Sequence, residues 1–287
     1  MLASLAGVLF DGFAYGMLLF LLSVGLSVTL GMMNFVNLAH CSFAMVGGYA
    51  TVTLMNRFGW PFLATLPMAF LLGSLASIVL ERTLYRRLYR ASDLDQCLLT
   101  IGIVFISVAA FAWFYTTEQQ SARPPEWLRG RIELAGMSFA VYRLFLIVFG
   151  LAVTAALVYG LEYTRFGATV RAAVDNQRMA RGLGIDVDRA FMLTFALGGG
   201  LAGLGGALAI EVVGLDPSFA LAFLVYVLIV VAVGGLGSIG GSFAAAAVLG
   251  ISDMAGKYYF PWLGAFLIYL VMVGLLMWRP QGLFGRR

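Results

Sequence analysis

Residues 4–30 read SLAGVLFDGFAYGMLLFLLSVGLSVTL, an apolar run in which Asp11 is the only charged side chain. A helix of about 20 such residues is long enough to cross the hydrocarbon core of a bilayer. The run therefore predicts a membrane-spanning helix. No basic segment precedes it, so we expect this span to be retained rather than removed as a signal peptide.

The rest of the 287-residue chain has the same apolar character. Hydrophobic residues make up 62% of the sequence and charged residues only 11%, whereas about 25% of the residues of an ordinary soluble protein are charged. The mean hydropathy is +0.95. This composition lacks the polar surface that a soluble enzyme needs. Two cysteines and one histidine are also too few for a disulfide framework or a structural metal site.

Further apolar runs alternate with polar segments along the whole sequence. They cover residues 33–55, 61–80, 96–117, 139–161, 190–213, 219–233, 242–255 and 261–278, with a polar loop expected at 118–138. This pattern predicts an all-α polytopic membrane protein with about eight transmembrane helices, folded as a single transmembrane domain over residues 1–287. The runs 219–233 and 242–255 are short, and we expect interrupted helices there that stop before the far side of the membrane.

Basic residues are distributed unevenly among the segments that separate these runs. Twelve of the 18 lysine and arginine residues lie in 82–95, 163–189 and 279–287, and the other six lie near Arg57, in 118–143 and at Lys257. Cytoplasmic loops are enriched in Lys and Arg. We therefore expect the first group to face the cytoplasm, with the N-terminus external and the C-terminus cytoplasmic. The positive charges form no single basic face, which argues against nucleic-acid binding.

The run at 33–55 begins with an unusual cluster of polar residues. Asn34, Asn37 and Cys41 follow the spacing i, i+3, i+7, which predicts one face of a helix, and His40 and Ser42 lie beside them. Polar groups at membrane depth need partners or a wet cavity. They either border a translocation pathway or form hydrogen bonds that hold helices together. A proton relay through His40 would need an acidic partner, and no Asp or Glu lies nearby in the sequence.

A weak internal repeat links this cluster to a segment two hundred residues later. Cys41-Ser42-Phe43-Ala44 and Gly241-Ser242-Phe243-Ala244 both follow a polar or glycine-rich break. Paired interrupted helices at corresponding positions point to a transport pathway, and chance similarity in an Ala/Gly/Phe-rich sequence is the alternative. On the pathway hypothesis, the candidate pathway residues are Asn34, Asn37, His40, Ser42 and Ser238.

The longest polar stretch contains RFGATVRAAVDNQRMARGLGI at 165–185. It predicts a short amphipathic helix at about 169–181, closed by Gly182 or Gly184 as a C-cap. This segment either docks into a groove of a cytoplasmic partner or is a solvated loop. The glycine-rich segment 234–241 lacks the Gly-Lys-Ser/Thr ending of a phosphate-binding loop. We therefore expect that the chain binds no cofactor and does not itself hydrolyse ATP.

Four stretches together resemble the permease subunits of branched-chain amino acid ABC importers, of the LivH and LivM type. They are GLSVTLGMMNFVNLAHCSFAMVGGY at 25–49, RFGATVRAAVDNQRMARGLGI at 165–185, GGLGSIGGSFAAAAVLG at 234–250 and RPQGLFG at 279–285. The similarity covers nearly the whole chain. The compact length and the expected external N-terminus are closer to LivH than to LivM.

The resemblance implies a bacterial inner-membrane permease that pairs with a second permease subunit, which is either a LivM-like partner in a heterodimer or a second copy of this chain. It also implies that two cytoplasmic ATPase subunits hydrolyse ATP and that a periplasmic binding protein delivers the substrate. The ATPase-coupling residues that it implies are Arg171, Ala172, Ala173, Asp175, Asn176, Arg178, Met179, Gly182 and Gly184. The segment departs from the Glu-Ala-Ala-x-x-x-Gly pattern of many other importers, because Arg171 replaces the Glu and Gln177 replaces the Gly. Cys41 likewise stands where we expect glycine.

A channel or a secondary transporter for a small neutral solute stays open as the alternative. Asn37-Leu38-Ala39 is faintly similar to the Asn-Pro-Ala motif of aquaporin-type channels, but residues 238–246 contain no second asparagine. A proton-coupled transporter needs buried carboxylates, and the candidates are Asp11, Glu211, Asp216 and Asp253, most of which we place near the membrane ends. The cargo that the resemblance implies is a branched-chain amino acid, an amide, urea or an aromatic acid.

Overall fold

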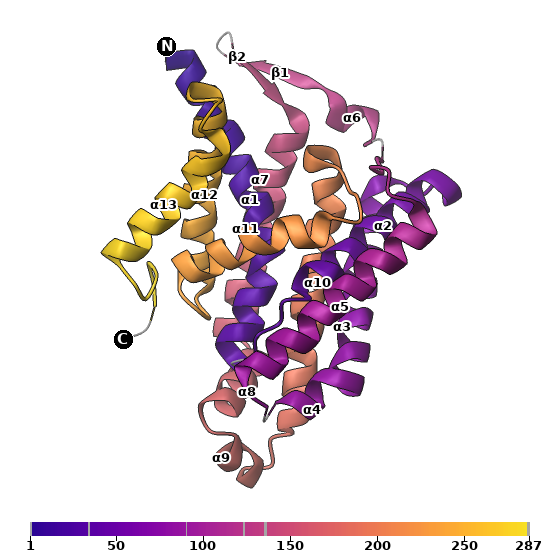
Figure 1. The fold of residues 1–287 in the computed structure, drawn as a ribbon, viewed down its shortest axis with the longest axis vertical. Helices are drawn as coiled ribbons and strands as arrows, with labels where there is room; N and C mark the ends of the chain where they lie inside the picture. The colour runs from indigo at the N-terminus through magenta and orange to yellow at the C-terminus, as the bar shows by residue number, and fades with distance from the viewer. Residues whose placement is uncertain (1, 34, 90, 123, 135–136, 286–287) are drawn as a thin grey trace.

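The computed structural model describes residues 1–287 except for 1, 34, 90, 123, 135–136 and 286–287. Nine main helices form the described part of the chain (Figure 1). They are α1 (Leu2–Met33), α2 (His40–Phe58), α3 (Phe62–Leu80), α5 (Asp93–Tyr115), α7 (Val141–Glu162), α10 (Val187–Val213), α11 (Phe219–Gly234), α12 (Ile239–Tyr259) and α13 (Gly264–Trp278). The all-α prediction for a polytopic membrane protein is confirmed.

Short elements connect the main helices. They are η1 (Glu81–Tyr85), α4 (Arg86–Leu88), α6 (Glu126–Arg129), α8 (Arg165–Asp175), α9 (Gln177–Gly182), and the strands β1 (Arg131–Leu134) and β2 (Met137–Ala140). The polar loop expected at 118–138 does connect two long helices, but it contains regular structure, because α6 and an antiparallel β-hairpin form there. Ile132 and Phe139 are cross-strand partners, and Phe139 packs edge-on against Phe10 of α1 with ring centroids 4.7 Å apart. These apolar contacts hold the hairpin on the helix bundle.

Six helices among the described residues are long and apolar enough to cross a membrane, and α11 and α13 are shorter apolar helices. The expected interruption at 242–255 is wrong, because α12 is a continuous helix of 21 residues. In contrast, α11 has only 16 residues, or about 24 Å of helix, which is less than the roughly 30 Å of a hydrocarbon core. Figure 1 shows α11 lying across the long axis of the molecule. The number of spans, about eight, stays a prediction.

The centre of the bundle is formed by α1 and α10, which are the most buried of the candidate spans. Glycines allow the two helix backbones to touch, because a Cβ at Gly25 would overlap the carbonyl oxygen of Gly198. The same close packing joins α10 to α2 at Gly47 and Gly203, and α10 to α3 at Gly73 and Gly199. Small residues at helix crossings are how membrane helices gain van der Waals contact. The high glycine content is thus used at the centre of the fold.

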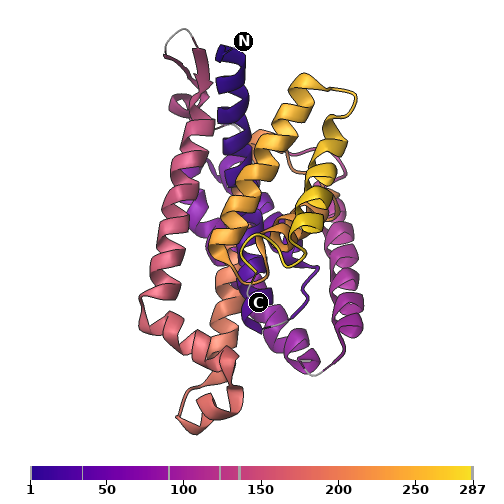
Figure 2. The same cartoon turned by 90° about the vertical axis from the view of Figure 1, so that its left-hand side faces the viewer.

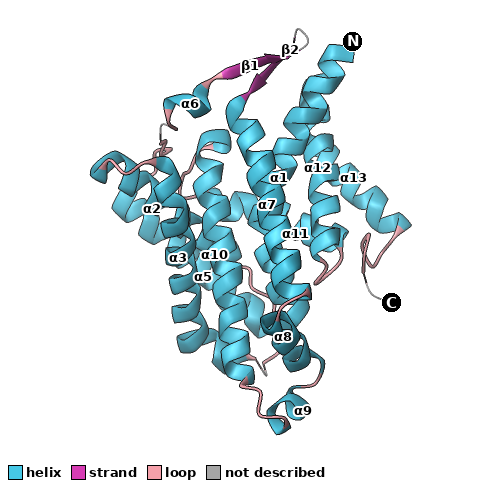
Figure 3. Cartoon of the chain, turned by 180° about the vertical axis from the view of Figure 1, so that it is seen from behind, coloured by secondary structure: helices cyan, strands magenta, loops and turns pink. Residues whose placement is uncertain are grey.

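The main helices from α1 to α10 alternate in direction along the chain (Figure 1), so the molecule has two distinct ends. One end carries the N-terminus and the β-hairpin (Figure 3). The other end carries α8 and α9, below the end of α7 (Figure 2). Eight of the twelve basic residues that the sequence assigns to the cytoplasm lie at this second end, in the segments between α3 and α5 and between α7 and α10 and in the first turn of α10: Arg82, Arg86, Arg87, Arg165, Arg171, Arg178, Arg181 and Arg189. Which end faces the cytoplasm stays a prediction.

Candidate functional site

The chain is not helical between α1 and α2. Residues 35–39 form an irregular segment, and α2 begins only at His40. The prediction that Asn34, Asn37 and Cys41 share a helix face is therefore wrong, since Asn37 precedes the helix; Asn34 itself lies outside the described residues. The Asn37 side-chain oxygen accepts a hydrogen bond from the backbone N–H of Ala39 at 3.1 Å. Such a local bond offers the backbone an alternative to the helix, which explains the break.

Two polar residues of α5 complete the hydrogen bonding of this break. The side-chain oxygen of Gln96 accepts from the backbone N–H of Val36 at 3.0 Å, and the hydroxyl oxygen of Thr100 accepts from that of Leu38 at 3.2 Å. Both side chains are buried. An irregular backbone at membrane depth must be satisfied by protein groups. Gln96 and Thr100 are not among the candidate residues predicted from the sequence, although two polar residues four positions apart at the start of an apolar run are a visible signal.

A line of polar and aromatic contacts continues along α2 and α5 beyond the break. Ser42 and Ser107 share a hydrogen bond of 2.7 Å between their hydroxyls, and Thr53 and Tyr115 share one of 2.6 Å. Between these pairs, Tyr49 stacks on Phe111 with ring centroids 4.6 Å apart. We call this line the α2–α5 seam; its members are Ser42, Tyr49 and Thr53 of α2 and Gln96, Thr100, Ser107, Phe111 and Tyr115 of α5.

His40 points away from the seam. Its Nε2 lies 3.1 Å from the backbone oxygen of Leu22 in α1, and because a carbonyl only accepts, Nε2 must carry the proton. The ring is fully buried, and a Cβ at Gly25 would touch it. Among the described residues no carboxylate contacts His40. A helix-to-helix hydrogen bond thus accounts for Nε2, whereas Nδ1 is buried without a hydrogen-bond partner among the described residues. A proton relay gains no support.

Ser238 also lies apart from the other pathway candidates. It precedes α12, and its hydroxyl oxygen accepts the backbone N–H of Gly241 at 3.0 Å, which caps the helix. It lines a groove of about 570 Å³ at the α8 end, together with Arg171 and Asp175. The structure therefore brings Ser238 to the expected coupling segment and not to Asn37 or Ser42.

The two copies of the internal repeat occupy equivalent positions. Ser42 lies in the first turn of α2 and Ser242 in the first turn of α12, and both helices follow a non-helical segment. Both side chains are buried. Ser42 bonds Ser107, whereas the Ser242 hydroxyl has no hydrogen-bond partner in the described part of the chain. The positions agree with the repeat hypothesis.

The segment 165–185 contains two helices and not the single one expected at 169–181. Asn176 separates α8 from α9 with an extended backbone (φ −154°, ψ 93°), and its side chain caps α9 by accepting the N–H of Met179 at 2.9 Å. Gly182 is the last residue of α9 and not its C-cap. Gly184 has φ +82°, a conformation that favours glycine. Asn is a strong N-cap residue, and this preference explains the break.

Some of the expected coupling residues are buried by, or hydrogen-bonded to, other residues of this chain. Ala173 is fully buried in a cluster with Val170, Ala180, Val187, Ala190 and Phe191, so it has no surface for a partner. Ala172 is half-buried, and Arg171 donates a hydrogen bond to the backbone oxygen of Leu161.

The exposed part of the segment forms a tip around α9. The exposed expected residues of this tip are Asp175, Asn176, Arg178, Met179, Gly182 and Gly184, and Arg171 of α8 is exposed as well. Met179 is 64% exposed, and its neighbour Leu183 is 76% exposed. Two apolar side chains thus stand at the outermost turn of this end, beside the positive charge of Arg178. We call this surface the α9 tip and define it as residues 175–184.

Ion pairs brace the base of the α9 tip. Asp188 at the start of α10 pairs with Arg181 at 3.1 Å and also with Arg86 of α4. All three side chains are about half exposed, so each pair contributes only about 0–1 kcal/mol. Nearby, the Tyr89 hydroxyl donates to the buried Glu81 at 2.7 Å. Burial, together with this bond, raises the pKa of the Tyr89 phenol, which keeps it protonated as a donor.

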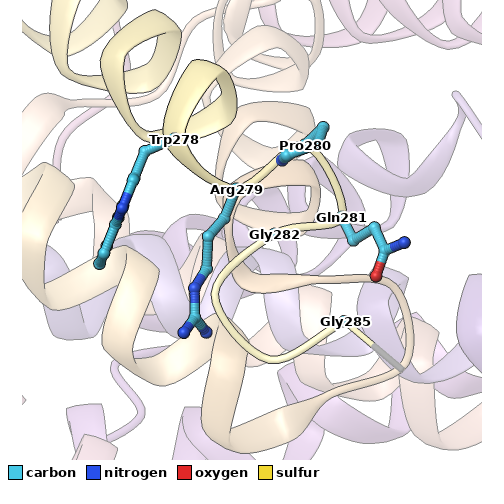
Figure 4. Close-up of a pocket in the computed structure, with 6 residues that line it drawn as sticks. All are labelled: Trp278, Arg279, Pro280, Gln281, Gly282 and Gly285. Atoms are coloured by element: carbon cyan, nitrogen blue, oxygen red, sulfur yellow. The ribbon is translucent and has the colours of Figure 1, made fainter. Parts of the chain in front are cut away.

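The C-terminal stretch folds back onto the end of α11. The N–H groups of Leu283 and Phe284 donate to the backbone oxygens of Val233 and Gly234, which are carbonyls that a helix end leaves without partners. The turn surrounds a cavity of about 520 Å³ (Figure 4), where Arg279 lies over the ring of Trp278 at 5.3 Å. The segment RPQGLFG therefore caps a short helix.

Comparison with known proteins gives a consistent result. A family model described as the permease component of branched-chain amino acid transport systems matches residues 8–276. A probable branched-chain amino acid transport permease, LivH of Methanocaldococcus jannaschii, is 27% identical over 286 residues, which cover 94% of this chain and 90% of that protein. LivH of Escherichia coli K12, a high-affinity branched-chain amino acid transport permease, is 23% identical, with 97% and 94% covered.

LivM of Escherichia coli K12, also described as a permease of high-affinity branched-chain amino acid transport, is 26% identical, and the match covers 93% of this chain but 68% of that protein. The chain thus spans nearly all of the LivH proteins and about two thirds of LivM. No solved structure matches the chain.

Proposed function

The chain belongs to the family of permease components of branched-chain amino acid transport systems, and from this premise we propose that it forms one half of the transmembrane unit of an ATP-binding-cassette importer for amino acids. It is a transport protein and not an enzyme. The names of its relatives favour a branched-chain amino acid as cargo, and a related small polar or amide compound is the wider class. Its length relative to LivH and LivM favours a LivH-like subunit that pairs with a LivM-like second permease.

The observation that carries the proposal is the α2–α5 seam. It places hydroxyl pairs and a buried glutamine in one line along two helices of a bundle whose core is mostly apolar. Polar residues inside membrane segments are expensive and usually mark a transported solute's route. On this proposal the route lies between the two permease subunits, on the side where α5 is exposed. Asn34, Asn37 and Ser42 remain its candidate residues, while the contacts of His40 and Ser238 favour structural roles.

Coupling to ATP hydrolysis is assigned to the α9 tip. The tip is the outermost surface of the end that is rich in arginine (Figure 2). Two cytoplasmic ATPase subunits, one for each permease, would bind these tips in surface grooves. Apolar side chains would anchor each tip, as in other helix-in-groove interfaces. A periplasmic binding protein would then approach the opposite end, where the N-terminus and the β-hairpin lie. This orientation makes the chain an inner-membrane protein with an external N-terminus and a cytoplasmic C-terminus.

A proton-coupled secondary transporter is less well supported. Two of its four candidate carboxylates are in ion pairs: Asp253 pairs with Lys257 at 2.6 Å, and Asp11 pairs with Arg143. Asp216 accepts a local hydrogen bond from the N–H of Ser218. Glu81, a buried carboxylate absent from the expected set, accepts a hydrogen bond from Tyr89.

Uptake into liposomes tests the proposed function. The chain is co-purified with a second permease and the ATPase subunits, reconstituted, and supplied with binding protein and labelled leucine. On this proposal, uptake requires ATP on the side of the membrane where the ATPase subunits lie. Uptake does not respond to a proton gradient. Uptake driven by a proton gradient without ATPase subunits would instead identify a secondary transporter.

A further inference from the structure

Arg82 lies just beyond the apolar part of α3. This helix has 19 residues from Phe62 to Leu80, or about 29 Å of helix, which matches the roughly 30 Å of a hydrocarbon core. Arg82 follows two residues later in η1 and is exposed. The next element, α4, lies at the end of the molecule that also carries α8 and α9 (Figure 1). The depth of Arg82 is therefore that of the phospholipid headgroups.

The guanidinium of Arg82 has no oxygen partner in the described part of the chain. Its Nε and Nη2 atoms lie 3.2 and 3.0 Å from the Sδ atom of Met192 in α10, and a thioether is only a weak acceptor. The contact holds the side chain against α10 and leaves its remaining N–H groups for an acceptor from outside the chain.

The neighbouring carboxylates do not neutralise Arg82. Asp188 of α10 pairs with Arg86 and also with Arg181, so two other arginines already share its charge. Glu81 is buried, whereas Arg82 is exposed, and no ion pair joins the two. The position thus has an excess of positive charge, and an anionic group would supply the missing counter-charge.

An exposed apolar ridge leads along α3 to Arg82. Leu71, Leu75 and Val79 are 59, 57 and 50% exposed, and they recur every four residues, so they lie on one side of the helix. Arg82 follows Val79 by three positions and continues this side. Membrane helices pack closely through small residues, and α3 does so toward α10 at Gly73. The bulky ridge therefore fits lipid acyl chains better than it fits a second helix.

We propose that Arg82 and this ridge form a binding site for an anionic phospholipid. The headgroup phosphate accepts hydrogen bonds from the Arg82 guanidinium, and an acyl chain lies along Leu75 and Val79. A zwitterionic phospholipid carries a cationic amine beside its phosphate, so Arg82 attracts it less strongly. Free phosphate has no acyl chain to place on the ridge. The site is independent of the transported solute and of the orientation of the chain in the membrane.

Lipid titration of the full-length chain tests the site. The purified chain is delipidated in detergent micelles, and native mass spectrometry counts the bound lipid at each concentration. The two probes are phosphatidylglycerol and phosphatidylethanolamine with identical acyl chains. Phosphatidylglycerol should bind about fivefold more tightly, which is the effect of one arginine near a charged membrane surface. Inorganic phosphate at the same concentration should not displace it.

Substitutions of Arg82 separate its charge from the rest of the site. Arg82→Gln should abolish the preference for phosphatidylglycerol, and Arg82→Lys, which keeps the charge, should retain most of it. Arg178→Gln is the matched control and should leave the preference unchanged, because it removes the same charge from α9, the outermost helix of this end (Figure 2). Both arginines are exposed, so thermal unfolding without lipid should be the same for all these chains.

Three results would overturn the site. The first is equal binding of the two lipids by the unmodified chain, or an unchanged preference in Arg82→Gln. The second is displacement of phosphatidylglycerol by inorganic phosphate, which would identify a general anion site. The third is loss of the preference when the chain is co-purified with a second permease, which would show that a protein group covers Arg82.

Discussion

Asn37 and Tyr85 lie 48 residues apart in the sequence, yet the Tyr85 hydroxyl donates a hydrogen bond of 3.3 Å to the side-chain oxygen of Asn37. The same oxygen accepts the N–H of Ala39. One amide side chain therefore shapes the break before α2 and ties it to η1 at the end of α3.

Replacing Asn37 with Leu should destabilise the chain itself. The Tyr85 hydroxyl and the Ala39 N–H both lose their acceptor in a buried setting, which costs roughly 1–3 kcal/mol. Tyr85→Phe removes only one of the two bonds and should cost less, about 1 kcal/mol. Unfolding of the purified chain in mixed detergent micelles measures both values. Equal stability of Asn37→Leu and the unmodified chain, together with slower uptake, would assign Asn37 to the pathway alone.

Thr100→Val should loosen the break between α1 and α2. The substitution keeps the shape of the side chain but leaves the Leu38 N–H without the acceptor that it has at 3.2 Å. Hydrogen exchange of residues 36–39 should become faster by about fivefold or more, equivalent to roughly 1 kcal/mol. Thr100→Ser restores a hydroxyl and should restore slow exchange. Slow exchange in Thr100→Val would mean that Gln96 alone holds the segment.

The α9 tip should couple transport to ATP hydrolysis through Leu183 and Met179. Leu183→Asp places a charge where an apolar anchor is expected, so substrate-stimulated ATPase activity and uptake should both fall by about tenfold or more. Because Leu183 is 76% exposed, the stability of the chain itself should stay unchanged. Arg178→Ala serves as the comparison, and its effect should be small because exposed ion pairs contribute little. Unchanged ATPase stimulation and uptake in Leu183→Asp would show that the α9 tip does not contact the ATPase subunit.

Ala173→Trp should act differently from changes at the tip. Ala173 is fully buried against α10, and inserting a large ring into a packed cluster typically costs about 1–3 kcal/mol or more. The variant should therefore lose stability as an isolated chain, before any partner is added. Thermal unfolding of the chain without ATPase subunits measures this loss. A stable Ala173→Trp chain that fails only in ATPase binding would show that Ala173 faces the partner after all.

Cysteine labelling tests the orientation. In a Cys41→Ala, Cys97→Ala background, Arg178→Cys at the α9 tip should react with an impermeant maleimide only after the cells are opened. Glu133→Cys, on the exposed hairpin of the opposite end, is the control and should react in intact cells. The reverse labelling pattern would show that the chain has the opposite orientation in the membrane.

The local composition of the sequence is enough to predict the membrane-spanning character, most helices and the separation of basic residues into two groups. Hydrophobicity and charge act on each segment separately, because every helix must satisfy the same bilayer. The motifs at 25–49, 165–185, 234–250 and 279–285 likewise point to the family without any knowledge of their contacts. The family match over residues 8–276 confirms that inference.

Other features depend on neighbours that are distant in the sequence. The helix face expected from Asn37 and Cys41 does not form, because Ala39, Tyr85 and two residues of α5 supply the hydrogen bonds of the break. The helical spacing predicts that Ala173 is accessible to a partner, but residues of α10 pack against it and bury it. Periodicity describes one helix at a time, whereas burial and hydrogen bonding are decided by which helices pack together. The tertiary structure therefore determines the α2–α5 seam and the α9 tip, because each depends on segments that only the packing brings together.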